Sequence, residues 1–175
     1  MKKKGDVFNL PLPADFLEAN AKLALFADGA SRGNPGAGAF AVFAQWPDEK
    51  IAFDLSDFAP NVTNNQMELL AVISGLKEIT NSLATNVRES IFVYTDSRYV
   101  VDGANSWLSS WKKRNWKKAD NKTPENLNLW QELDQLLLNF KKVKFIWVKG
   151  HQGHPQNERC DKICNQILDK MLSPT

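Results

Sequence analysis

Residues 22–29 read Lys-Leu-Ala-Leu-Phe-Ala-Asp-Gly, a short apolar run that ends at an acid and a glycine. Residues 91–96 read Ile-Phe-Val-Tyr-Thr-Asp, a second run of this kind that ends at an acid. Apolar runs of this length are typical of strands buried in a sheet. If the two strands are parallel neighbours, Asp28 and Asp96 end them at the same edge, where α/β folds place ligands. Each acid also has a simpler interpretation, Asp28 as a turn former before glycine and Asp96 as part of a helix cap.

The rest of the chain predicts an α/β fold with a five-stranded mixed sheet flanked by helices. Strands are expected at residues 22–27, 37–46, 51–58, 91–95 and 143–149, with residues 29–38 as a tight connection. Helices are expected at residues 64–80, at 97–112 with a break near Gly103, after a cap at Thr123-Pro124, and from Pro155 onward. Strands 1–3, joined by short turns, should form an antiparallel meander, while strands 4 and 5, reached through helices, should be parallel.

Composition and charge limit the class of protein. The chain has 175 residues, the size of a single domain, and a net charge of only +2. The stretch from Ser106 to Lys122 contains six basic residues and one acid, and so carries a net charge of +5. This local surplus predicts one polyanion-binding patch. We expect a cytoplasmic monomer without a membrane span, in which residues 1–20 are an extension of unknown role and residues 21–175 form the domain.

Two further acids are set beside apolar helix faces. Glu68 lies within Met-Glu-Leu-Leu-Ala, and Asp161 flanks the apolar stripe of the last helix. Singly, each is typical of a solvated helix residue. Together with Asp28 and Asp96 they form a set of carboxylates in apolar surroundings, which is costly unless a cation neutralises them. Mg²⁺ binds through a few carboxylates, water and substrate oxygens.

The segments around these acids resemble ribonuclease H type 1, the bacterial type. Five strings carry the resemblance, in family order and with family-like spacing: residues 28–36 (DGASRGNPG), 63–69 (TNNQMEL), 94–100 (YTDSRYV), 147–155 (WVKGHQGHP) and 157–161 (NERCD). The resemblance covers roughly Lys22 to Met171. It implies an endonuclease that hydrolyses the RNA strand of RNA–DNA hybrids.

The resemblance also implies the roles of the acids. Asp28, Glu68, Asp96 and Asp161 are expected to bind two Mg²⁺ ions, for which Mn²⁺ is a possible substitute, in an in-line attack that leaves 5′-phosphate and 3′-hydroxyl ends. His151 is expected to assist, either in proton transfer or in product release.

Substrate contacts follow from the same resemblance. Asn34 and Asn64 match positions that contact the RNA minor groove, and Thr63 and Asn126 match positions that hold a DNA phosphate; Ser97 is a further expected contact. The stretch at about 107–122 resembles the basic protrusion of the bacterial enzymes, with expected contacts at Trp107, Trp111, Lys112, Lys113, Arg114, Trp116 and Lys117. The simpler interpretation is packing, which we favour for Trp107, with a mixed role for Trp111 and Trp116.

Other interpretations remain open at this point. The chain could be a non-catalytic hybrid-binding module, an integrase- or resolvase-like DNA nuclease of the same fold, or a domain of a reverse transcriptase. His151, His154, Cys160 and Cys164 have the right types for zinc. However, the two cysteines continue the apolar stripe of the last helix, which favours core packing, and His154 fits a cap before Pro155.

Overall fold

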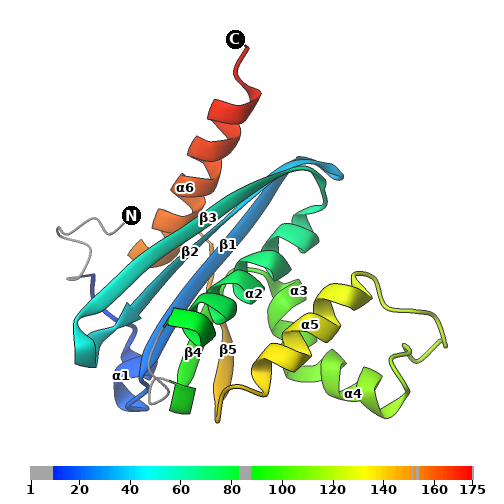
Figure 1. The fold of residues 1–175 in the computed structure, drawn as a ribbon, viewed down its shortest axis with the longest axis horizontal. Helices are drawn as coiled ribbons and strands as arrows, with labels where there is room; N and C mark the ends of the chain where they lie inside the picture. Colours follow the sequence, from blue (N-terminus) through cyan, green and yellow to red (C-terminus); the bar gives the residue numbers. More distant parts are fainter. Residues whose placement is uncertain (1–9, 83–87, 151, 153, 175) are drawn as a thin grey trace.

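The computed structural model of the chain describes residues 10–82, 88–150, 152 and 154–174. Its centre is a five-stranded sheet in the order β3-β2-β1-β4-β5 (Figure 1). The strands are β1 (Leu23–Gly33), β2 (Gly36–Trp46), β3 (Ile51–Val62), β4 (Ile91–Thr95) and β5 (Val143–Trp147). β1 to β3 pair antiparallel, whereas β4 pairs parallel with both β1 and β5. The predicted mixed sheet is therefore confirmed.

The carboxyl ends of three strands, β1, β3 and β5, differ from the prediction. The difference in length matters most for β1. Asp28 does not end this strand, because β1 continues to Gly33 and the connection to β2 shrinks to two residues. Residues 28–33 stay extended because each pairs with a residue of β2, from Asp28 opposite Ala41 to Gly33 opposite Gly36. β3 likewise runs on to Val62 along β2, and β5 stops at Trp147, the last residue that pairs with β4.

The helices are α1 (Ala14–Glu18), α2 (Asn64–Ser82), α3 (Arg98–Asp102), α4 (Leu108–Lys113), α5 (Leu127–Leu137) and α6 (Pro155–Leu172), with a short 3₁₀ turn, η2 (Pro47–Glu49). The predicted capping box begins α2: the Thr63 amide donates to Gln66 Oε1 at 2.8 Å, and the Gln66 amide donates to Thr63 Oγ1 at 3.2 Å. The predicted break near Gly103 is a π-helical turn, η4 (Gly103–Trp107), between α3 and α4.

The predicted cap at Thr123-Pro124 is wrong. α5 begins at Leu127, and Asn126 before it has a left-handed backbone with φ 54°. Asparagine tolerates this conformation better than most residues, and a single left-handed residue prevents a helix from running through it. The Asn126 side chain donates to the Tyr99 hydroxyl at 3.1 Å, which holds the turn against α3.

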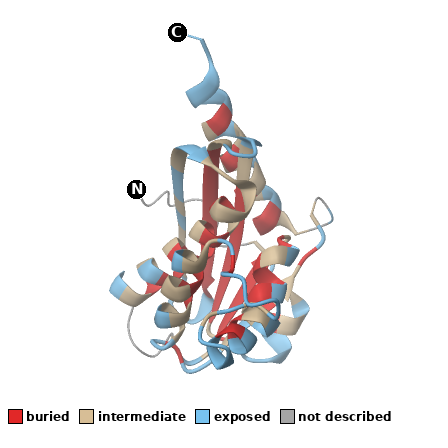
Figure 2. Cartoon of the chain, turned by 90° about the vertical axis from the view of Figure 1, so that its right-hand side faces the viewer, coloured by how far each residue is buried: buried red, intermediate tan, exposed pale blue. Residues whose placement is uncertain are grey.

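Buried side chains form two clusters, one on each face of the sheet. Figure 2 shows that the strands between them are buried along much of their length. α2, α4 and α5 cover one face, with the fully buried Trp130 at the centre of their contacts. α6 covers the other face together with α1, whose Phe16 is buried. None of the helices in the described ranges is both long and apolar enough to span a membrane.

Candidate active site

Asp28 and Asp96 come level with one another across neighbouring parallel strands. The register of β1 and β4 sets Phe26 opposite Tyr94, and Asp28 and Asp96 each follow two residues later. β4 ends at Thr95, so Asp96 is at the carboxyl edge as predicted. Asp28 reaches the same level from within β1, and its side chain is only 6% exposed. The two acids therefore meet although only one of them ends a strand.

Helix α2 brings Glu68 to the same place through a close contact at Gly29. A β-carbon at Gly29 would lie 2.4 Å from the carbonyl carbon of Met67 and 2.5 Å from the Glu68 amide nitrogen. Only glycine allows the backbones of β1 and α2 to approach this closely. The residue after Asp28 thus packs directly on the backbone at Glu68.

Helix α6 approaches Asp28 from the opposite face of the sheet. The Cys164 thiol donates to the Asp28 carbonyl oxygen at 3.7 Å, and the Cys160 thiol donates to the Phe26 carbonyl oxygen at 3.6 Å. Asp161 lies one turn before Cys164 on this helix. Its Oδ1 accepts from Asn165 Nδ2 at 3.2 Å, which orients the carboxylate from the following turn.

Two hydrogen bonds hold the Glu68 carboxylate. Asn64 Nδ2 donates to Glu68 Oε1 at 3.0 Å, and the Ser97 hydroxyl donates to Glu68 Oε2. Ser97 is itself buried and caps α3 by accepting from the Val100 amide at 3.2 Å. Two residues predicted to bind substrate therefore orient one of the predicted metal ligands.

Two of the acids, Asp28 and Glu68, have raised pKa values. Burial raises the pKa of Asp28 to about 8, and the charges of Asp96, Asp161 and Glu68 contribute to this rise, against a lowering hydrogen bond from the Gly29 amide. Burial also raises the pKa of Glu68, as does Asp96, although the hydrogen bonds from Ser97 and Asn64 oppose this shift. The coupling of Asp28 to three other acids identifies a cluster of negative charge that a cation would stabilise.

The donor set at this cluster fits a hard divalent cation, since it consists of carboxylate oxygens from β1, α2, α6 and the end of β4. Among the described residues, no group of three or more His, Cys, Asp or Glu side chains is gathered closely enough to hold a metal as it stands. His151 lies outside the described residues. Cys160 and Cys164 are buried in the second cluster, where they fill the core as predicted, and His154 occupies the cap position of α6 without a capping side-chain bond.

A cavity of about 410 Å³ is lined by Asn34, Thr63, Asn65, Glu125 and Asn126. The β1–β2 turn, the start of α2 and the turn before α5 form its walls. Asn34 Oδ1 accepts from the Asn64 amide at 3.1 Å, which ties the turn to α2. Four of the five predicted substrate residues outside the protrusion thus lie in or beside one polar hollow, and the fifth, Ser97, bonds Glu68 instead.

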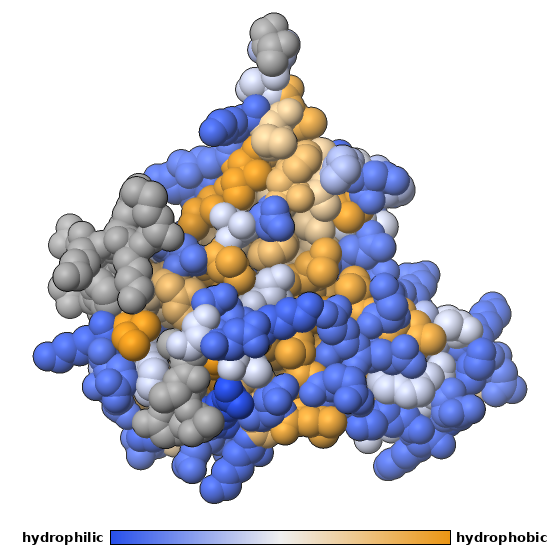
Figure 3. All heavy atoms as spheres, in the orientation of Figure 1, coloured by the Kyte–Doolittle hydropathy of each residue, from blue (hydrophilic) through white to orange (hydrophobic). Residues whose placement is uncertain are grey.

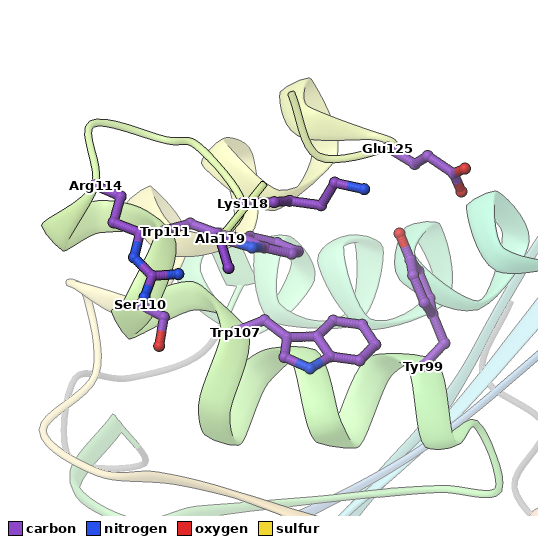
Figure 4. A pocket seen from close by; sticks show the side chains of 8 residues that line it. All are labelled: Tyr99, Trp107, Ser110, Trp111, Arg114, Lys118, Ala119 and Glu125. Carbon is purple, nitrogen blue, oxygen red and sulfur yellow. The ribbon is translucent and has the colours of Figure 1, made fainter. Parts of the chain in front are cut away.

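The protrusion carries another cavity, of about 500 Å³. Figure 4 shows the rings of Tyr99, Trp107 and Trp111 turned toward it, with Arg114 and Lys118 beside them. Trp111 is 9% exposed and Trp107 is half-buried, so Trp111 is packed more completely into the protein than Trp107. The outer surface of this region, at the lower right of Figure 3, is mainly hydrophilic.

The cations of the protrusion are not equivalent. Lys113 and Arg114 are exposed, whereas Lys112 Nζ lies 2.9 Å from Asp134 Oδ1 and Lys117 Nζ donates to Thr123 Oγ1 at 3.0 Å. Trp116 is half-buried against the first cluster. All four of these cations are exposed, but Lys112 and Lys117 also have protein partners.

Six residues that line these cavities were not among the predicted site residues: Asn65, Tyr99, Ser110, Lys118, Ala119 and Glu125. The Tyr99 hydroxyl accepts from both Asn126 Nδ2 and Trp130 Nε1, at 3.1 and 2.9 Å, so it links α3 to α5. Asn65 and Tyr99 lie within the family-like strings at residues 63–69 and 94–100. Their position next to expected substrate contacts could have identified them as lining residues.

Comparison with known proteins agrees with this arrangement. The family model described as RNase H matches residues 20–168, which include all four acids. The chain belongs to the ribonuclease H family. Ribonuclease H of Nitrosomonas eutropha is 42% identical over 154 residues, which are 87% of this chain and 93% of that protein. This membership confirms the resemblance to the bacterial type 1 enzymes and makes the chain an endoribonuclease.

Solved structures share the fold. LC9-RNase H1, described as a type 1 RNase H with the type 2 active-site motif, is 33% identical, with a TM-score of 0.72 over 83% of this chain and 72% of that chain. LC11-RNase H1, solved in complex with an RNA/DNA hybrid, has a TM-score of 0.67 over 87% of this chain and 100% of that chain. At 22% identity, the second likeness shows the fold alone.

Proposed function

We propose that this ribonuclease hydrolyses the RNA strand of RNA–DNA hybrids in a reaction that depends on divalent cations. The observation that carries the proposal is the convergence of Asp28, Glu68, Asp96 and Asp161 from both faces and the edge of one sheet, where the charges of the other three acids help to raise the pKa of Asp28. A fold that only bound nucleic acid would have no use for this cluster, because negative charge repels phosphate.

The four acids would hold two Mg²⁺ ions, with Mn²⁺ as a possible substitute. When bound, these ions would activate the attacking water and stabilise the departing 3′-oxygen, which gives 5′-phosphate and 3′-hydroxyl products. Asp28 supplies a carboxylate from a buried strand, where little water competes for it. Ser97 and Asn64 fix the orientation of Glu68. His151 is proposed, on the family resemblance, to assist proton transfer or product release.

The two cavities differ in chemistry, which supports recognition of two different strands. The cavity at Asn34, Thr63 and Asn126 offers amide and hydroxyl groups suited to sugar hydroxyls and phosphate oxygens, and the Glu125 carboxylate also lines it. The protrusion offers exposed cations and aromatic rings, which suit a phosphate backbone and flat sugars or bases. LC11-RNase H1, which shares this fold, is itself known bound to an RNA/DNA hybrid.

A panel of nucleic acids tests the proposal. RNA–DNA hybrid, duplex DNA, duplex RNA and single-stranded RNA are each incubated with the protein, with Mg²⁺ or with EDTA. We expect the hybrid alone to be cut, only with Mg²⁺, and only in its RNA strand, with no cutting by Asp28→Asn. Cleavage of duplex DNA would favour an integrase-like nuclease, and tight hybrid binding without cleavage would favour a binding module; either result contradicts the proposal.

A further inference from the structure

Residues 10–21, which we term the N-terminal clasp, lie almost entirely before the stretch that matches the family. The clasp nevertheless belongs to the core. Phe16 of α1 is 2% exposed and packs edge-to-face on Phe92 of β4, with ring centroids 5.9 Å apart. Leu10 and Leu12 pack on the same cluster, and Ala21 is buried in it. In Figure 1 the clasp runs along the base of the sheet to β1.

Two buried amide side chains hold the backbone of the clasp. Gln45 of β2 donates from Nε2 to the Leu10 carbonyl oxygen at 3.0 Å. Gln156, in the first turn of α6, donates from Nε2 to the Pro11 carbonyl oxygen at 2.8 Å and to Gln45 Oε1 at 2.9 Å. Both residues are buried, Gln45 with 4% and Gln156 with 1% of its surface exposed. Because buried polar groups need partners, these bonds fix α6, β2 and the clasp relative to one another.

A third contact reaches the strand that leads to Asp96. The Tyr94 hydroxyl donates to Asp15 Oδ1 at 3.0 Å, and its ring stacks on Phe26 with centroids 4.9 Å apart. Tyr94 and Phe26 precede Asp96 and Asp28 by two residues each, and Gln156 precedes Asp161 by five. The clasp therefore contacts β4 and α6 directly, and contacts β1 through the Tyr94 ring.

We propose that the clasp is a positioning element for the acid cluster. By fixing the start of α6 against β2 and β4, it sets how closely Asp161 approaches Asp28 and Asp96, and so sets the affinity of the site for divalent cations. The main positioning residues are Phe16 of the clasp and Gln156 of α6, which holds the clasp backbone. The part of this proposal that concerns cations rests on the proposed function.

A purely stabilising role predicts something different. If the clasp only added buried surface, its loss would lower the melting temperature and leave the cation affinity of the folded protein unchanged. If it positions α6, its loss also weakens cation binding while the protein is fully folded. Residues that orient metal ligands typically change metal affinity by roughly 10- to 100-fold when they are removed.

The test uses the full chain and three variants at a temperature at which all are folded. Phe16→Ala removes the apolar anchor, and its matched control is Leu17→Ala, the next residue of α1, which is 61% exposed. Gln156→Met removes the amide with little change of volume and decides the matter if Phe16→Ala does not fold. Mg²⁺ binding is measured by calorimetry without nucleic acid, amide hydrogen exchange is followed along α6, and kcat and KM are determined on the hybrid.

We expect Phe16→Ala and Gln156→Met to bind Mg²⁺ roughly 10-fold more weakly and to exchange faster around Cys160 to Cys164, with KM for the hybrid within about 2-fold of the parent protein. Leu17→Ala should match the parent throughout. Folded variants with unchanged Mg²⁺ affinity overturn the proposal. If the parent protein neither binds Mg²⁺ nor cuts the hybrid, the proposed function fails, and unchanged exchange in α6 would then overturn the clasp separately.

Discussion

The acid cluster and the protrusion of residues 107–122 both gather charge of one sign, but in opposite environments. Asp28 is 6% exposed, and burial together with its neighbouring acids raises its pKa to about 8, so burial and repulsion both oppose its charged form. Lys113 and Arg114 face solvent, and Lys112 has an acidic partner. Exposed charges cost little stability, whereas buried like charges cost much. The acid cluster therefore marks where function opposes stability, and the protrusion marks where the two are compatible.

The largest expected effect is on the cluster itself. Asp96→Asn should reduce kcat on the hybrid by roughly 1000-fold, because it removes charge that would hold the proposed cations, a contribution of several kcal/mol. Ser97→Ala, which removes a bond that orients Glu68 and the side-chain cap of α3 but leaves all four acids, should reduce kcat by about 10-fold. Steady-state kinetics at saturating Mg²⁺ checks both values. Equal losses in the two variants would break the distinction between ligand and orienting residue.

The cost of the buried charge should appear as a dependence of stability on pH. The pKa of Asp28 is raised from 3.8 to about 8, so the folded protein holds a proton that the unfolded chain releases, and stability falls as pH rises through this window. In EDTA at pH 8.5, Asp28→Asn should therefore be more stable than the parent by roughly 2–4 kcal/mol. At pH 4 the advantage should vanish. Urea unfolding at both pH values is the measurement, and an equal difference at both would rule out the ionisation of Asp28 as its cause.

Glycines test the packing of the two regions. A β-carbon at Gly103 would lie 2.1 Å from the buried ring of Trp130, so Gly103→Ala should cost about 1–3 kcal/mol. Gly29→Ala should cost more, since its β-carbon would meet backbone atoms of α2, which cannot rotate away. Ser106→Ala, at an exposed position of η4, is the matched control and should be close to neutral. Chemical denaturation gives the order, and a smaller cost at Gly29 would argue against the close contact of β1 and α2.

The smallest effects belong to single cations. Lys113→Ala should weaken hybrid binding a few-fold and lower the slope of log Kd against log salt by about 1, as expected for one lost phosphate contact. Lys112→Ala should do less, because Asp134 already neutralises this ammonium group. Fluorescence anisotropy across a salt series separates the two. An equal change of slope would mean that Lys112 leaves Asp134 when it binds nucleic acid.

The parts of the fold that depend on local sequence were predictable. The buried runs at residues 23–27 and 91–95 and the capping box at Thr63 and Gln66 follow from periodicity and from bonds between near neighbours. The start of α5 was not predictable in the same way. It depends on Asn126, whose side chain bonds to Tyr99, 27 residues earlier in the chain. The length of β1 was missed because β2 supplies the partners that keep residues 28–33 extended.

The candidate site shows the same division. The four acids could be singled out because motifs surround them, but their meeting depends on long-range contacts: Gly29 on the backbone of α2, and Cys164 on the carbonyl oxygen of Asp28. The clasp was expected only as an extension of unknown role. Its polar anchors, Gln45 and Gln156, are 111 residues apart and belong to no local pattern. Burial of polar side chains is decided by tertiary packing, which sequence periodicity does not describe.

The central claim is that the four acids form a cation-dependent active site, and an NMR titration of the full chain with Mg²⁺ tests it most directly. The Gly29 amide, which donates to Asp28 Oδ1, and the Asn165 side-chain amide, which donates to Asp161, serve as probes. We predict saturable shifts of both signals in the parent protein and their loss in Asp28→Asn. Shifts confined to exposed acids elsewhere, such as Asp57, or shifts at the probes that persist in Asp28→Asn, would contradict the claim.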